Sequence, residues 1–249
     1  MKGSGPMDAE KKKSLKNNLL IVAGLVLLEI VIIIMALVMD HYYSGENGEE
    51  LKATLQEYQQ MLSGFGFWSY PVMVIVQILQ MLLALIPGGP LAFLFGFMFG
   101  TVGGAVVGTI GNILGTAMIV WAVNRFGMKF VNMFCNSKGF EKLTFLHDPH
   151  KRDLLIFILF LIPGTPKDLI TFFAPFTKAK PSRIVILATV GRLPALILST
   201  SIGDTLAAGN IWATVMLITV TMLVVGVSIF LKDIVMNRKA AVSKEETEQ

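Results

Sequence analysis

The sequence predicts an all-α polytopic membrane protein. Of its 249 residues, 54% are hydrophobic and only 15% are charged, and the mean hydropathy is +0.67. Soluble domains carry about 25% charged residues, so this composition excludes an ordinary soluble enzyme. Two proline-glycine breaks also fall inside apolar runs. Such breaks are tolerated in a membrane only inside protein or beside a wet cavity, because lipid cannot satisfy the freed backbone groups.

The two breaks have nearly the same sequence. The first reads IPGGP over residues 86–90, and the second reads IPGTP over residues 162–166. Proline removes a backbone donor and glycine lowers helix stability, so each break predicts a helix, a sharp turn and a second short helix. The prolines expected to form the breaks are Pro87, Pro90, Pro163 and Pro166.

A first membrane helix is expected over residues 19–39, after a lysine-rich tail over residues 1–18. The run is long enough to cross about 30 Å of hydrocarbon, and it is too long for a signal peptide. The preceding lysines place the N-terminus in the cytoplasm. Glu29 lies near the middle, where a charge costs about 2.5 kcal/mol or more. It should face other helices, either as a structural partner or as a coupling group.

Residues 40–66 are acidic and poor in lysine and arginine, which is typical of the outer side of a membrane. Leu51, Leu55, Tyr58 and Leu62 recur at helical spacing and predict a short amphipathic helix. This helix is either a packing lid or a docking site.

The first break lies in a segment that we expect to enter the membrane from outside and return there, over residues 71–99. Its first half is too short to span comfortably and carries Gln77 and Gln80 on one side. A full membrane helix follows over residues 100–123. Small residues on one face of that helix allow close packing of a neighbour. They form two pairs, Gly104 with Gly108 and Gly111 with Gly115.

Residues 124–152 are basic and aromatic, and they are expected to lie in the cytoplasmic interface. The histidines and aspartates near residue 150 do not have the spacing of a metal motif, so no metal site is predicted. Cys135 is the only cysteine and cannot form an internal disulfide.

The second break lies within residues 154–176, whose basic flanks predict entry from the cytoplasm and return to it. Lys167 and Asp168 directly follow this break. The helix expected over residues 183–202 carries Gly191-Arg192, which mirrors Gly111-Asn112 in the first half. A buried arginine is expensive, so Arg192 either pairs with Asp168 or Glu29, or serves a functional site.

The rest of the chain completes the expected topology. A short outer turn is predicted over residues 204–210, a last membrane helix over 211–231 and a charged cytoplasmic tail over 232–249. The membrane transport domain would therefore span residues 19–231, with its core over 71–210. Two opposed re-entrant hairpins, each followed by a membrane helix, form an inverted repeat, which places a substrate near the midplane. Helix N-termini after Pro90 and Pro166 would favour an anion there.

Several residue runs resemble the VTT-domain membrane proteins, also called SNARE-associated Golgi proteins, of the DedA-like superfamily. They are IPGTPKDLIT at 162–171, TVGRLP at 189–194, STSIGD at 199–204, GFMFG at 96–100 and RFG at 125–127. The likeness covers about residues 79–210. It implies two opposed re-entrant hairpins and lipid translocation, such as flipping of polyprenyl phosphate or phospholipid headgroups, coupled in some members to the proton gradient.

The chain departs from the DedA transporters of the polyprenyl-phosphate type. Those proteins carry acidic residues on the first hairpin, whereas residues 90–100 have none here. They also carry arginines at positions that correspond to Phe160 and Pro166. The sequence therefore resembles the branch that lacks these groups, in which Lys167 and Arg192 would supply the cationic contact to a phosphate.

The predicted function is a transporter or scramblase for a phosphate-bearing lipid in a bacterial-type inner (plasma) membrane. A small-solute or ion transporter and a non-transporting scaffold are the alternatives. The sequence shows no catalytic constellation, so no enzyme activity and no cofactor are expected, and nucleic acid is not an expected partner. The protein is a candidate homo-oligomer. Transport is a candidate for coupling to protons or cations, with Glu29, Asp168 and Asp204 as the coupling groups. The candidate substrate-binding residues are Lys167, Asp168, Arg192, Gly88, Gly89, Gly164 and Thr165.

Overall fold

The computed structural model describes residues 20–21, 23–24, 26–38, 40, 46–64, 66–83, 88–134, 152–162, 165 and 167–227. The chain divides into two compact units. One comprises residues 1–42 and 218–249, and the other comprises residues 43–217. All regular structure in the described ranges is helical, which confirms the predicted all-α class.

The first unit contains an apolar helix, Val26–Val38, and the final part of the apolar helix Ile211–Val227. The Thr219 hydroxyl donates a hydrogen bond to one carboxylate oxygen of Glu29. The other oxygen of Glu29 is buried and has no hydrogen-bond partner in the described part of the chain. Glu29 therefore contacts a neighbouring helix, as the cost of a charge in lipid predicts, and its role in coupling stays a prediction.

Among its described residues, the second unit has three helical segments that are long and apolar enough to cross a membrane: Gly66–Leu83, Gly88–Phe126 and Pro181–Ala207. In chain order its elements are α2 (Glu46–Ser63), η1 (Gly66–Trp68), α3 (Ser69–Leu83), α4 (Gly88–Phe126), α5 (Met128–Phe134), α6 (Arg152–Leu161), α7 (Lys167–Phe173), η3 (Ala174–Thr177) and α8 (Pro181–Ala207). The amphipathic helix expected around residues 51–62 is confirmed as α2.

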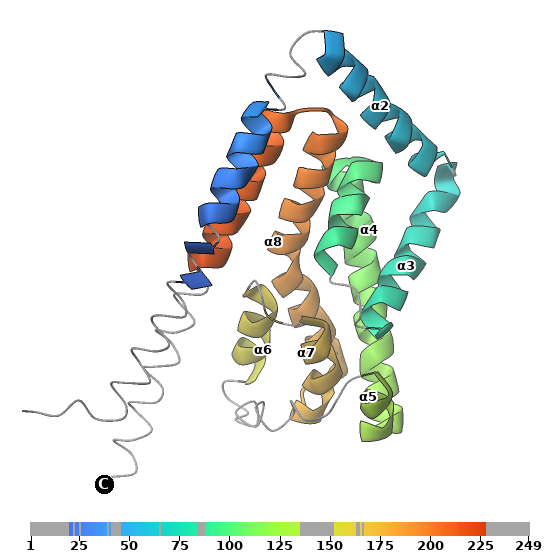
Figure 1. Cartoon of the computed structure of the whole chain (residues 1–249). Helices are drawn as coiled ribbons and strands as arrows, with labels where there is room; N and C mark the ends of the chain where they lie inside the picture. The colour runs from blue at the N-terminus through green and yellow to red at the C-terminus, as the bar shows by residue number, and fades with distance from the viewer. Residues whose placement is uncertain are drawn as a thin grey trace, which may run out of the picture. The chain divides into compact units, whose positions relative to one another are not determined.

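Both expected breaks separate helices of this unit. Figure 1 shows α3 leaving the end where α2 lies and stopping midway, after which the start of α4 runs back toward that end. From the opposite end, α6 runs to the middle and α7 runs back. With 10 and 7 residues, α6 and α7 are too short to cross a bilayer. The two broken segments therefore approach the middle of the unit from opposite ends.

Two glycines allow the start of α4 to touch α8 backbone to backbone. A Cβ atom added at Gly96 would overlap the backbone of Thr200, and one added at Gly203 would overlap the backbone of Phe93. No side-chain movement relieves an overlap with backbone. This contact, which we call the glycine contact, holds the first broken segment against α8.

A sharp kink at Gly100 divides α4 into two helices. Gly100 has φ 73° and ψ 175°, a conformation that side chains other than hydrogen disfavour. After the kink, the Thr101 backbone N–H and hydroxyl both donate to Asp204 Oδ2, at 2.9 and 2.6 Å. Asp204 of α8 thus caps the second half of α4, satisfying a backbone donor that the new helix start leaves free.

Two apolar clusters pack α6 and α7 against the long helices. Val120 of α4 and Ile184 of α8 enclose Ile156 and Phe160 of α6 in the first cluster. In the second, Phe172 of α7 packs with Met81 of α3 and Ile119 of α4. Large apolar side chains on the outer faces stay exposed, including Val102 at 77% and Trp121 at 63%. Exposed apolar surface on a long apolar helix is what contact with lipid requires.

Charged residues join the starts of α6 and α8. Arg183 Nη1 donates to Asp153 Oδ2 at 2.9 Å, and Arg152 Nε donates to Asp153 Oδ1 at 3.2 Å. Arg152 Nη1 also donates to the Thr177 carbonyl at 3.1 Å. Partial burial raises the pKa of Asp153, but the hydrogen bonds and charges of Arg183 and Arg152 outweigh it, and the pKa lies below the ordinary value of 3.8.

The structure corrects one predicted boundary. The turn expected over residues 204–210 begins later than predicted, because α8 continues to Ala207 and the chain turns over residues 208–210. Asp204 lies inside α8, and its side chain caps the second half of α4. Of the expected interfacial segment, residues 128–134 form α5. Residues 135–151 lie outside the described part, as do the tails.

Candidate substrate-binding site

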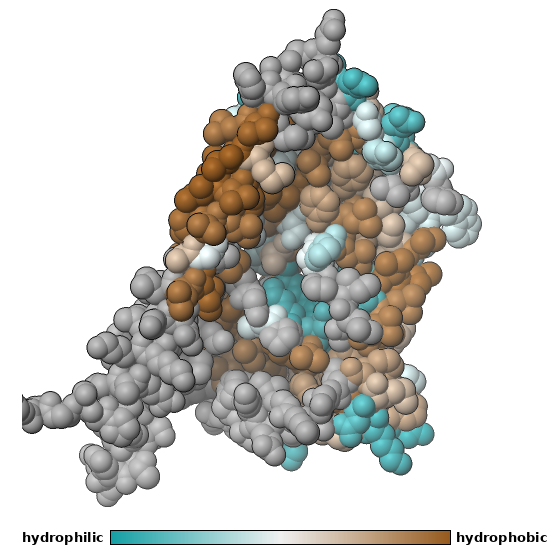
Figure 2. Space-filling model, in the orientation of Figure 1, coloured by the Kyte–Doolittle hydropathy of each residue, from teal (hydrophilic) through white to brown (hydrophobic). Residues whose placement is uncertain are grey.

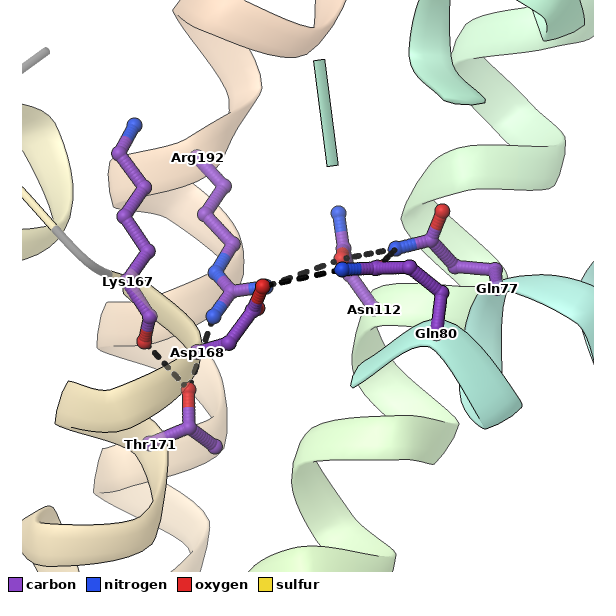
Figure 3. Close-up of polar contacts among 7 residues, drawn as sticks. All are labelled: Gln77, Gln80, Asn112, Lys167, Asp168, Thr171 and Arg192. Carbon is purple, nitrogen blue, oxygen red and sulfur yellow. Dashed lines mark hydrogen bonds and ion pairs between the residues drawn. The ribbon is translucent and has the colours of Figure 1, made fainter. Parts of the chain in front are cut away.

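Polar side chains from four helices meet in the middle of the second unit, where both broken segments end (Figure 3). The first broken segment and α4 contribute only carboxamides, whereas α7 and α8 contribute all the charges. We call the set the polar cluster. Its members are Gln77 and Gln80 of α3, Asn112 of α4, Lys167, Asp168 and Thr171 of α7, and Arg192 of α8.

Arg192 lies at the centre of the polar cluster. Its Nη1 is 3.1 Å from Asp168 Oδ1 and donates to Asn112 Oδ1 at 3.3 Å. Its Nη2 donates to the Thr171 hydroxyl at 2.8 Å. The guanidinium also lies over the Phe160 ring, 5.3 Å from the centroid. Only 9% of the arginine side chain is exposed, so pairing with a carboxylate is what makes its burial tolerable.

The carboxamides link the two broken segments. Gln80 Nε2 donates to Asp168 Oδ2 at 3.0 Å, which joins α3 directly to α7. Gln77 Nε2 lies within hydrogen-bonding distance of Gln80 Oε1, at 3.3 Å, and of Asn112 Oδ1, at 3.2 Å. Gly111 allows this approach, because a Cβ atom there would lie 2.6 Å from Gln77 Cγ. All three carboxamide residues are buried.

The polar cluster leaves hydrogen-bonding groups unused. Arg192 Nε is buried without a partner in the described ranges, and so are the hydroxyls of Thr116 and Thr189. Thr116 lies one turn beyond Asn112 on α4, and Thr189 lies one turn before Arg192 on α8. Buried polar groups without partners are rare in native proteins, because each costs about 1–3 kcal/mol. Arg192 Nε is therefore the donor of the polar cluster that a polar ligand or a water molecule would satisfy.

Lys167 adds a second cation that is half-buried. In Figure 3 its ammonium points to the same side as the amide nitrogen of Asn112 and the carbonyl oxygen of Gln77, away from Thr171. Figure 2 shows hydrophilic residues in a hollow near the middle of the view. A buried polar centre between helices whose outer faces are apolar suits a ligand with a charged head and apolar tails.

Other predicted site residues lie differently. Gly88 is near the polar cluster, since a Cβ atom there would lie 3.8 Å from Gln80 Oε1, whereas nothing lies within 4 Å of one at Gly89. The Thr165 hydroxyl donates to the carbonyls of Leu159 and Ile162, so it caps the end of α6. Pro90 is exposed in the first turn of α4. Pro87, Pro163, Gly164 and Pro166 lie outside the described residues.

The prediction of site residues omitted the carboxamides and Thr171. Gln77 and Gln80 are three positions apart in an otherwise apolar helix, which places them on one face. This spacing indicates a polar contact. The corresponding positions of Asn112 and Arg192 in the two halves of the chain indicate one as well. The structure makes this contact direct at 3.3 Å. Nothing in the local sequence distinguishes Thr171 from other helical threonines.

The fold and the polar cluster define a helical membrane protein with a buried polar centre between two broken segments. The family model of the VTT domain matches residues 86–205. This match confirms, over residues 86–205, the family resemblance expected from the sequence. It spans the start of α4 through most of α8, and thus includes Asn112, Asp168 and Arg192 but not Gln77 or Gln80. Comparisons with curated proteins and with solved structures gave no match.

Proposed function

We propose that this protein moves a phosphate-bearing lipid headgroup across a bacterial-type inner membrane, as a transporter or scramblase and not as an enzyme. The observation that carries the proposal is the polar cluster itself. It contains two cations, one carboxylate and unused donors at the point where two opposed broken segments end. Inverted repeats of this kind hold substrates near the midplane.

In this mechanism the two broken segments are re-entrant hairpins of an inverted repeat. The headgroup phosphate takes hydrogen bonds from Arg192 Nε and the Lys167 ammonium, which supply charge-assisted donors. Asp168 keeps Arg192 in place and limits its charge. The acyl chains stay against the exposed apolar faces of the long helices. Movement of one hairpin relative to the other would break the Gln80–Asp168 hydrogen bond and expose the polar cluster to the opposite side.

The test is movement of fluorescent lipids in proteoliposomes, measured by a membrane-impermeant quencher. Removing Arg192 alone would leave Asp168 buried without its partner, so the informative variant is Arg192→Gln with Asp168→Asn, which keeps the net charge and the approximate shape. We expect this double variant to lose at least about 90% of the flipping rate, because each lost charge-assisted hydrogen bond weakens binding about tenfold.

Lys129→Gln is the matched control, because Lys129 is an exposed cation on α5 outside the polar cluster. It should flip lipid at the wild-type rate. Full flipping by the folded double variant would contradict the proposal. A rate that changes when a pH gradient is imposed would mark a coupled transporter, and an unchanged rate would mark a scramblase.

A further inference from the structure

The charges of the polar cluster add up to a small positive number. Lys167 and Arg192 contribute two positive charges and Asp168 contributes one negative charge, which leaves a net charge of +1. The other members, Gln77, Gln80, Asn112 and Thr171, are neutral. Among the described residues of the second unit, the nearest other acidic group along α8 is Asp204, twelve positions from Arg192 and engaged in capping α4.

A buried site binds best a ligand whose charge it neutralises, because an uncompensated charge away from water is costly. A phosphodiester carries one negative charge at neutral pH. A phosphomonoester carries about −1.5 to −2, and a zwitterionic headgroup carries none overall. The net charge of +1 therefore matches a monoanionic phosphodiester. It would leave a phosphomonoester with excess negative charge and a zwitterion with excess positive charge in the site.

The neutral half of the polar cluster suits the rest of such a headgroup. A carboxamide offers both donors and acceptors, which is the pattern that hydroxyl groups satisfy. The Asn112 amide nitrogen and Gln77 carbonyl oxygen point to the same side as the Lys167 ammonium in Figure 3. A quaternary amine would need an acidic or aromatic partner. The one carboxylate of the cluster, Asp168, is engaged by Arg192 and Gln80, and the ring that the described contacts place against the cluster, that of Phe160, lies against Arg192.

From these observations we infer that the substrate is an anionic phosphodiester lipid with a hydroxyl-bearing headgroup, such as a phosphatidylglycerol. The phosphate lies between Lys167 and Arg192, and the hydroxyl groups lie against Gln77 and Asn112. This inference rests on the proposed function and narrows it to one headgroup class. It also makes Asp168 a determinant of specificity, because its negative charge sets the net charge of the polar cluster and therefore the headgroup charge that the site prefers.

The experiment compares lipids that share one labelled acyl chain and differ in the headgroup. Phosphatidylglycerol (−1, with hydroxyls), phosphatidylmethanol (−1, without hydroxyls), phosphatidic acid (about −2) and phosphatidylcholine (zwitterionic) are each reconstituted with the wild-type protein. We expect phosphatidylglycerol to flip fastest, about tenfold faster than phosphatidic acid and phosphatidylcholine. One unmatched charge in a buried site should weaken headgroup binding by about tenfold or more.

Charge-changing variants make the inference sharper than a ranking alone. Asp168→Asn raises the net charge to +2 and should move the preference to phosphatidic acid. Lys167→Gln lowers it to 0 and should abolish the preference for phosphatidylglycerol over phosphatidylcholine. Glu57→Gln and Lys129→Gln make the same chemical changes at exposed positions outside the cluster and should leave the ranking unchanged. Gln77→Leu should abolish the advantage of phosphatidylglycerol over phosphatidylmethanol.

The possible failures are distinguishable. If no lipid moves with folded protein, the proposed function is wrong and the inference falls with it. If lipids move but their flipping rates do not depend on headgroup charge and do not change in Asp168→Asn or Lys167→Gln, the proposed function stands and the inference is wrong. Liposomes loaded with glycerophosphoglycerol test the same headgroup without acyl chains. Release of glycerophosphoglycerol without lipid movement would show that the site accepts the free phosphodiester and not the lipid.

Discussion

The helices α4 and α8 meet in two regions of opposite character. At one end, the glycine contact brings the backbones of Gly96 and Thr200 together with no side chain between them. In the middle, α4 and α8 are joined by side chains, with Asn112 Oδ1 accepting a hydrogen bond from Arg192 Nη1 at 3.3 Å. The first region leaves no room for a ligand, and the second leaves donors unused.

This difference separates a structural role from a functional one along the same pair of helices. Close backbone packing without polar groups is how membrane helices associate when hydrophobic burial cannot drive them together. Buried polar groups with free donors add little stability and are retained in membranes mainly where function needs them. The glycine contact is therefore expected to determine folding, and the polar cluster is expected to determine what the protein moves.

The largest effect on stability is expected at the glycine contact. Gly96→Val places a branched side chain against the Thr200 backbone, which has no rotamer that would move away. Overpacking against backbone should cost about 3 kcal/mol or more. Thermal unfolding of the detergent-solubilised protein, followed by the loss of the monodisperse peak in size-exclusion chromatography, measures the change.

Gly226→Val is the control for this substitution, because a Cβ atom at Gly226 would meet nothing within 4 Å. It should lower the transition temperature only slightly. If Gly96→Val and Gly226→Val were equally stable, the glycine contact would not have the structural role assigned to it.

A smaller effect is expected from Asp168→Asn. The variant leaves Arg192 charged and buried without its carboxylate partner, which should lower the free energy of unfolding by about 2 kcal/mol, below the range for a fully buried pair because 20% of Asp168 is exposed. Adding Arg192→Gln should restore most of the loss. A double-mutant cycle of unfolding temperatures measures this coupling, and additive losses would contradict the pair.

Asp204→Ala tests which region Asp204 serves. As the cap of Thr101 it should contribute about 1 kcal/mol to stability and leave lipid movement unchanged at temperatures where the protein is folded. The sequence also made Asp204 a candidate for proton coupling. Loss of a pH-gradient response with normal stability in this variant would favour coupling over capping.

The sequence predicted the broken segments because proline and glycine act locally. Pro87-Gly88-Gly89-Pro90 cannot continue a helix whatever surrounds it, and the structure separates α3 from α4 there. The cost of burying a charge in lipid likewise predicted that Arg192 pairs with an acidic residue or serves a functional site. Arg192 could have paired with Glu29 or Asp168, and the structure pairs it with Asp168 at 3.1 Å.

Features that depend on contacts between distant segments were not predictable in the same way. Asp204 was expected to begin a turn. Its carboxylate instead caps a helix that begins 103 positions earlier in the chain. The helix α8 itself continues to Ala207. Similarly, the Gln80–Asp168 contact joins residues 88 positions apart.

The smallest effect concerns the ion pairs at the starts of α6 and α8, which lie away from both regions of the α4–α8 interface. Because the pKa of Asp153 is lowered in the folded protein, its carboxylate stabilises the fold above its ordinary value of 3.8, and this contribution is lost as the pH falls through the lower folded value. Arg183 is 56% exposed, so the contribution should be only about 0.5 kcal/mol. Wild type and Asp153→Asn, unfolded thermally at pH 7 and again near pH 3, should therefore differ slightly at pH 7 and converge at the lower pH. A difference in stability that persists at low pH would show that Asp153 acts through packing and not through its charge. The contact between the starts of α6 and α8 would then resemble the glycine contact more than the polar cluster.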